Sequence, residues 1–176
     1  MKKVMLLTIF AALMLISSAA VAQTATGTLT VTATVNGSIQ LVFNSDAAGV
    51  ALSSGAGTNT ATLAFGNVSA FGAISAGIVR STTATTFTVS SAVDVLVSKT
   101  NSASANYTLK AQLGAADAVN TWQVGGTTVT NAAQSTVTAT GAYAANNNFP
   151  VAITVPFTTA SGTLISNTIN YTATAN

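Results

Sequence analysis

The chain has 176 residues, of which only 5% are charged, and it contains neither histidine nor cysteine. This length is typical of one domain, and the lack of cysteine excludes a framework of disulfides. Without histidine the chain also lacks the most common general base and metal ligand of proteins.

Residues 1–22 have the composition of a secretory signal peptide. Lys2 and Lys3 precede an apolar stretch at 4–16, as in bacterial signal peptides, and the sequence AVA at 20–22 fits a cleavage site. The apolar stretch is too short to cross a hydrocarbon layer of about 30 Å. We therefore predict cleavage after Ala22, secretion, and no membrane anchor in the mature form.

The charges of the predicted mature chain cancel. They are Arg80, Lys99 and Lys110 against Asp46, Asp94 and Asp117. No basic patch that could hold phosphates remains, so a nucleic-acid partner is not expected. Low net charge favours association between copies, which suits a protein that assembles.

Apolar and polar residues alternate along the whole mature chain, as in half-buried β-strands. The opening stretch at 26–43 alternates over about twice the usual strand length of 5–6 residues. Further alternating stretches lie at 58–72, 85–99, 105–114, 120–131, 135–144, 147–157 and 162–176. No stretch after Ala22 has apolar residues at helical spacing.

Within these stretches the apolar side chains share faces. The predicted faces are Val93, Val95 and Val97; Tyr107, Leu109, Ala111 and Leu113; Phe149, Val151, Ile153 and Val155; and Ile169, Tyr171 and Ala173. Gly125 and Gly126 predict a two-residue hairpin.

Seven or eight short strands predict an all-β antiparallel sandwich of immunoglobulin-like or jelly-roll type. A β-solenoid is the alternative, although the chain has no fixed repeat period. Regular β-branched and aromatic residues argue against a disordered chain.

The chemistry of the side chains argues against an enzyme. A glycosidase needs two neighbouring carboxylates, and with three Asp and no Glu such a pair is not expected. Lys99 and Lys110 have no supporting motif for a Ser–Lys pair. Asn44 and Asp46 have too few carboxylates around them for a Ca²⁺ loop and predict a polar turn. We therefore expect no catalytic residue, no cofactor and no metal.

Two stretches resemble a family of filament subunits. The sequence TATLAFGNVSAFG at 60–72 is similar to the L-x-F-G-x-V segment of the spore coat U-like and archaic chaperone–usher pilins. The ending at 149–176 is similar to their closing stretch, in which an apolar strand ending in VP precedes a glycine-containing turn and a last alternating strand. The opening stretch resembles their N-terminal extension. Many members carry a disulfide near the first strand, which this chain lacks.

The resemblance implies an incomplete immunoglobulin-like sandwich whose missing last strand leaves a hydrophobic groove. The N-terminal strand of a neighbour fills this groove in trans, which is called donor-strand complementation. Residues 23–35 would form the donor strand, and 36–176 the pilin domain with its own first strand at 36–44, after a bend at Gly37. The last alternating stretch reaches Asn176, so no later strand is expected to close the sheet. The inward donor side chains would be Ala25, Gly27, Leu29, Val31 and Ala33, with Gly27 in a shallow subsite and Leu29 and Val31 in deep ones.

The implied function is that of the main structural subunit of an extracellular bacterial filament, a pilus or fimbrium at the cell surface that serves attachment or biofilm formation. The implied partners are identical subunits in a homopolymer, with a periplasmic chaperone and an outer-membrane usher during assembly.

Three alternatives remain open from the sequence. Residues 28–43 could form one long edge strand, or a hairpin, of a closed domain. A closed fold could act as a surface-layer or matrix protein that associates laterally. A carbohydrate-binding adhesin module could stack sugars on Tyr107, Tyr143, Tyr171 or Trp122, although Trp122 is expected in the core.

Overall fold

The computed structural model describes residues 26–176. The predicted signal peptide, its cleavage point and the predicted donor residue Ala25 therefore lie outside the described residues. The chain divides into two units, Met1–Thr34 and Val35–Asn176. In the first unit, the described residues 26–34 form neither helix nor strand, and their side chains are exposed.

The second unit is built entirely from β-strands. They are β1 (Ser38–Ser45), β2 (Val79–Thr82), β3 (Thr86–Ser91), β4 (Val93–Thr100), β5 (Tyr107–Leu113), β6 (Thr121–Val124), β7 (Thr127–Val129), β8 (Ser135–Gly141), β9 (Asn146–Asn148), β10 (Val151–Pro156) and β11 (Ile169–Ala175). No helix occurs within 26–176, and thus none there is long and apolar enough to cross a membrane. The predicted all-β class is confirmed.

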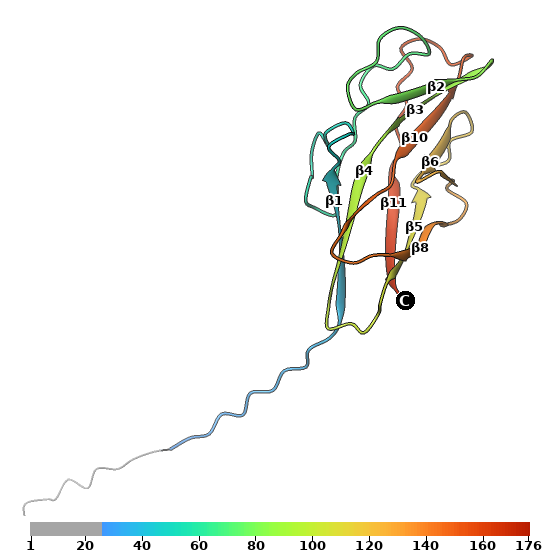
Figure 1. The fold of residues 1–176 in the computed structure, drawn as a ribbon. Coiled ribbons are helices and arrows are strands. Elements are labelled where there is room, and N and C mark those ends of the chain that lie inside the picture. The colour runs from blue at the N-terminus through green and yellow to red at the C-terminus, as the bar shows by residue number, and fades with distance from the viewer. Residues whose placement is uncertain (1–25) are drawn as a thin grey trace, which may run out of the picture. The chain divides into compact units, whose positions relative to one another are not determined.

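The strands form three antiparallel sheets, in the orders β1-β4-β9, β2-β3-β10-β6-β7 and β11-β5-β8 (Figure 1). The predicted strand at 85–99 is in fact two strands, because the chain leaves the five-stranded sheet after β3 and enters another sheet as β4. Ala92 lies at this transition. The hairpin at Gly125 and Gly126 is confirmed, since both have positive φ, 55° and 80°, and join β6 to β7.

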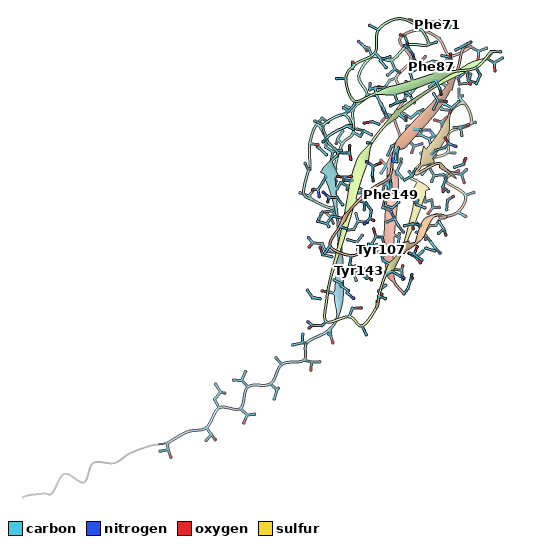
Figure 2. The ribbon with its side chains drawn as sticks, viewed as in Figure 1. Phe71, Phe87, Tyr107, Tyr143 and Phe149 are labelled. Atoms are coloured by element: carbon cyan, nitrogen blue, oxygen red, sulfur yellow. The ribbon has the colours of Figure 1, made fainter. Side chains whose placement is uncertain are left out.

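Two clusters of buried side chains hold the sheets together. The first is formed by Ile78, Phe87, Val89, Ala111, Leu113, Trp122, Val124, Val129, Ile153 and Val155. The second is formed by Val95 and Val97 of β4 with Tyr107 and Leu109 of β5, and Tyr143 and Phe149 pack against it (Figure 2). Most side chains on the predicted inward faces are thus buried. The exceptions are Phe149 and the β11 residues Ile169, Tyr171 and Ala173, which are half-buried. Trp122, 5% exposed, lies in the core as expected.

Three predicted stretches form less strand than their alternation indicates. The opening stretch becomes a strand only from Ser38, so the single long edge strand over 28–43 is not formed. The stretch 58–72 has only isolated bridges, Phe43 with Thr58 and Ser54 with Thr62. In 162–176 only β11 is paired. Alternation indicates which face a side chain takes, but a strand also needs a continuous series of backbone hydrogen bonds to a neighbouring segment. The remaining residues of these stretches do not form such a series.

Candidate functional site

A large groove with an apolar floor lies over the five-stranded sheet. Its volume is about 1870 Å³, above the roughly 300–1,000 Å³ of a typical small-molecule pocket. Residues of β3, β6 and β10 line its floor: Phe87, Val89, Trp122, Val151, Ile153 and Val155. No lysine, arginine or aspartate is among the residues that line the groove.

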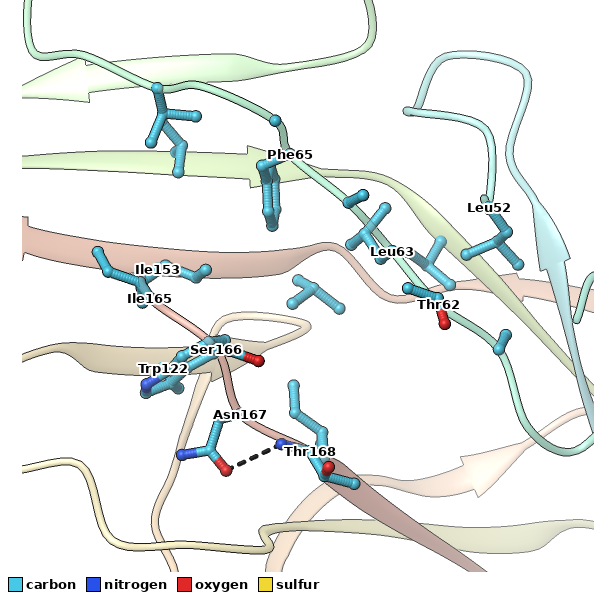
Figure 3. Close-up of a pocket in the computed structure, with 18 of the residues that line it drawn as sticks. Leu52, Thr62, Leu63, Phe65, Trp122, Ile153, Ile165, Ser166, Asn167 and Thr168 are labelled. Carbon is cyan, nitrogen blue, oxygen red and sulfur yellow. Dashed lines mark hydrogen bonds between the residues drawn. The ribbon is translucent and has the colours of Figure 1, made fainter. Parts of the chain in front are cut away.

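Two segments form the walls of the groove (Figure 3). The loop wall is residues 57–65, which follow β1, and the β11 wall is residues 163–171, which lead into β11 and include its first residues. In part of each wall every second residue is half-buried. These half-buried residues are Ala61, Leu63 and Phe65 on the loop wall, and Ile165, Asn167, Ile169 and Tyr171 on the β11 wall. Residues 61–65 and 164–171 therefore keep the side-chain period of a strand.

The facing edges of the two walls are unpaired. β11 is an edge strand whose only strand partner among the described residues is β5. The backbone bonds that tie the loop wall to other segments go to Phe43, Ser53 and Ser54. Within 26–176, no backbone hydrogen bond joins one wall to the other. Amide and carbonyl groups along the groove can thus accept a further strand.

Two aromatic rings meet across the groove near one end of the β11 wall. Phe43 of β1 and Tyr171 of β11 pack edge to face, with ring centroids 5.1 Å apart. Burial raises the pKa of the Tyr171 hydroxyl above its ordinary value of 10.0.

The predicted donor residues Gly27, Leu29, Val31 and Ala33 belong to the first unit and are exposed. The side chains of Leu29 and Val31 are 88% and 80% exposed. Their role as donor residues requires a second copy of the chain, and it stays a prediction.

Two of the three carboxylates, those of Asp46 and Asp94, lie close enough to affect each other. Asp46 follows β1, and Asp94 on β4 is paired with Asn44 of β1. Burial and the Asp46 carboxylate raise the pKa of Asp94, while hydrogen bonds from the Ala48 amide and from Asn148 lower that of Asp46. The pair lies outside the groove lining, and the described residues form no group of three or more His, Cys, Asp or Glu. The third carboxylate, Asp117, accepts a 2.8 Å hydrogen bond from Trp122 Nε1.

The resemblance to the pilins implies a hydrophobic groove, but the sequence did not identify the segments that form it. Its floor and walls come from segments as far apart as Leu63, Trp122 and Ile165, and alternation within one segment does not reveal which others it meets. The available signal was that the stretches 58–72 and 162–176 both alternate like strands.

Comparisons of the chain with protein-family models, with curated proteins and with solved structures find no match. The likeness to pilins therefore depends on the residues quoted above alone.

Proposed function

We propose that the chain is a structural subunit of an extracellular filament, in which residues 23–35 of one copy add a strand to the groove of the next copy. The observation that carries the proposal is the pair of facing walls, which share no backbone hydrogen bond with each other, above an apolar floor. An open sheet edge beside an apolar groove is the arrangement that strand addition uses.

In this proposal the loop wall and the sheet β11-β5-β8 belong to one layer of an immunoglobulin-like sandwich that covers the five-stranded sheet. The inserted strand takes the place between them and completes the layer. The first buried cluster supports this arrangement, because Ala111 and Leu113 of β5 pack with residues of the five-stranded sheet, and Ile165 and Ile169 pack against the same cluster.

Length and chemistry of the N-terminal segment match the groove. The β11 wall spans the nine residues from 163 to 171, which at about 3.3 Å per residue is about 30 Å. The predicted inward positions from Ala25 to Ala33 span the same number of residues, and they carry no charge. The uncharged lining of the groove favours such an uncharged strand.

Burial of Leu29 and Val31 supplies much of the proposed binding free energy. Because they are 88% and 80% exposed, each side chain has most of its surface left to bury, a gain of roughly 1.5–3 kcal/mol. Each main-chain hydrogen bond adds about 0.5–1.5 kcal/mol. Subunits joined in this way separate slowly, as a filament for attachment or biofilm requires. A chaperone and an usher would cover the open groove before assembly.

The first test removes the donor strand. A mature chain without residues 23–35 should stay monomeric, and a synthetic peptide of 23–35 should bind it and raise its Tm. Filaments formed by the shortened chain would instead favour lateral association, and a peptide without effect would contradict the groove as acceptor.

A second test keeps the chain at full length. The double substitution Leu29→Asp with Val31→Asp should abolish filaments in electron microscopy, because it places charges in an uncharged groove. Thr30→Asp is the matched control, since Thr30 alternates with these residues and is expected to face outward. Equal loss of filaments in the control would contradict the predicted donor face.

A further inference from the structure

We propose that the loop at 114–120, between β5 and β6, is a brace that keeps the groove in the shape that accepts a strand, with Asn167 as its positioning residue. This inference rests on the proposed function, because it assigns a role to residues around the same groove.

The first observation is the end of the ladder between β5 and the β11 wall. Regular pairing stops with Leu113 and Ile169, and the Gly114 amide then donates to the Thr168 carbonyl at 2.7 Å. Beyond this point the wall continues toward residue 163, but β5 has ended. The wall would have no support on this side unless a side chain took over.

Asn167 provides that support. Its Oδ1 accepts a hydrogen bond from the Ala115 amide at 3.2 Å, and its Nδ2 donates to the Ala115 carbonyl at 3.0 Å. Oδ1 also accepts from the Thr168 amide at 2.9 Å, the bond drawn in Figure 3. One side chain thus pairs with both backbone groups of Ala115, as a neighbouring strand residue would. These bonds use the side of the wall toward β5 and leave the edge facing the loop wall unpaired.

The other end of the same loop is tied to the groove floor. The Asp117 carboxylate accepts hydrogen bonds from the amides of Val119 and Asn120 at 3.0 and 2.9 Å. It also accepts one from Trp122 Nε1 at 2.8 Å, and the Trp122 side chain lies in the floor. The loop therefore links a wall residue, Asn167, to a floor residue, Trp122.

This connection explains why the wall can be extended without a partner in the groove. An unpaired edge gains backbone hydrogen bonds by collapsing onto other parts of the protein. A wall held from the β5 side needs less rearrangement when a strand arrives, and preorganisation of this kind strengthens binding. Asn167 is half-buried and lies outside both buried clusters, so its removal should affect strand uptake more than folding.

The test uses the full-length chain with Leu29→Asp and Val31→Asp as an acceptor that does not self-assemble, and a fluorescent peptide of 23–35 as the donor. Adding Asn167→Ala should weaken peptide binding about tenfold, measured by fluorescence anisotropy, because the wall loses the three hydrogen bonds of this side chain and has to be ordered when the peptide binds. The free energy of unfolding of the acceptor without peptide, measured in urea, should change by less than the free energy of binding. Asn167→Asp should be intermediate, since it accepts from the Ala115 amide but cannot donate to the carbonyl. Asn131→Ala, an exposed position outside the groove lining, is the matched control.

The outcomes separate the two proposals. If the acceptor with Asn167 intact does not bind the peptide, the proposed function fails and the brace fails with it. If it binds and Asn167→Ala binds equally well, only the brace is overturned. If Asn167→Ala lowers the free energy of unfolding in urea by as much as it weakens the free energy of peptide binding, Asn167 has an ordinary structural role. That outcome would also overturn the brace.

Discussion

Gly141 packs closely against Tyr107 of the second buried cluster. Tyr107 is fully buried, and its hydroxyl accepts a hydrogen bond from Asn147 Nδ2 at 3.1 Å. A Cβ atom built at Gly141 would lie 2.2 Å from Cζ of the Tyr107 ring, closer than a real contact allows. Gly141 does not have positive φ, so space, and not backbone conformation, requires glycine there.

Gly141→Ala should therefore destabilise the second unit by about 1–3 kcal/mol, the usual cost of overpacking a core. Urea unfolding monitored by tryptophan fluorescence measures this change. The control is Gly27→Ala, because nothing lies within 4 Å of a Cβ at Gly27, and its urea midpoint should match that of the unchanged chain. Equal midpoints for both variants would show that the ring of Tyr107 moves aside without cost.

Asp117 gives the fold a predictable response to acid. Burial acts to raise the pKa of this carboxyl, but hydrogen bonds from Asn120, Trp122 and Val119 outweigh burial and lower the pKa from 3.8 to about 2. Because the folded pKa lies below the unfolded one, the stabilisation is complete above pH 3.8 and is lost as the pH falls toward 2. Asp117→Asn should thus lower the urea midpoint at pH 7, with the difference shrinking between pH 4 and pH 2.

Asp94→Asn is the control with the opposite sign. Burial and the Asp46 carboxylate raise the pKa of Asp94, so its charge opposes folding above that pKa, and its removal should not lower the urea midpoint at pH 7. A midpoint difference for Asp117→Asn that stays constant down to pH 2 would contradict the role of the Asp117 charge.

Among the elements, the sequence predicted side-chain faces better than strand boundaries. The face from Tyr107 to Leu113 is buried as predicted, since alternation against a core is a local property. Residues 61–65 of the loop wall and 164–168 of the β11 wall also alternate in burial but are not strands. Whether an extended segment becomes a strand depends on the segment beside it, which a local pattern does not contain.

The ring pair of Phe43 and Tyr171 suggests a register for the proposed inserted strand. Gly27, without a side chain, fits beside Tyr171 over this pair. In an antiparallel arrangement with β11, Leu29 then lies beside Ile169, and the outward residue Thr28 lies opposite Asn170. Directly opposed residues of antiparallel strands have Cα atoms about 4.5–5.5 Å apart, which is within the range that a disulfide spans.

We therefore expect the chain with Thr28→Cys and Asn170→Cys to form covalent ladders between copies on non-reducing gels after mild oxidation. The natural chain has no cysteine, so every such bond reports the introduced pair. Thr32→Cys with Asn170→Cys is the comparison, because it would be opposed only if the strand ran parallel to β11 with Ala33 at the ring pair. Ladders from this second pair alone would reverse the direction of the inserted strand.

For the whole molecule, sequence reasoning reached the β class, the hairpin and the core position of Trp122. It did not identify the segments that form the groove, or show that Asp46 lies near Asp94. Both depend on contacts between strands that are distant in the chain, and many pairings of similar alternating segments satisfy the same local pattern. The three separate sheets are therefore information that only the folded chain provides.

The extension and the groove belong to different units of the chain, and this separation gives the proposed assembly a direction. A contact between two unlike surfaces is heterologous, so copies add head to tail and the series does not close after two. Every such filament has, at one end, a copy whose groove is empty and, at the other end, a copy whose N-terminal strand is unbound. Growth and capping would then follow different chemistry at the two termini, and a single foreign strand could stop elongation at one of them.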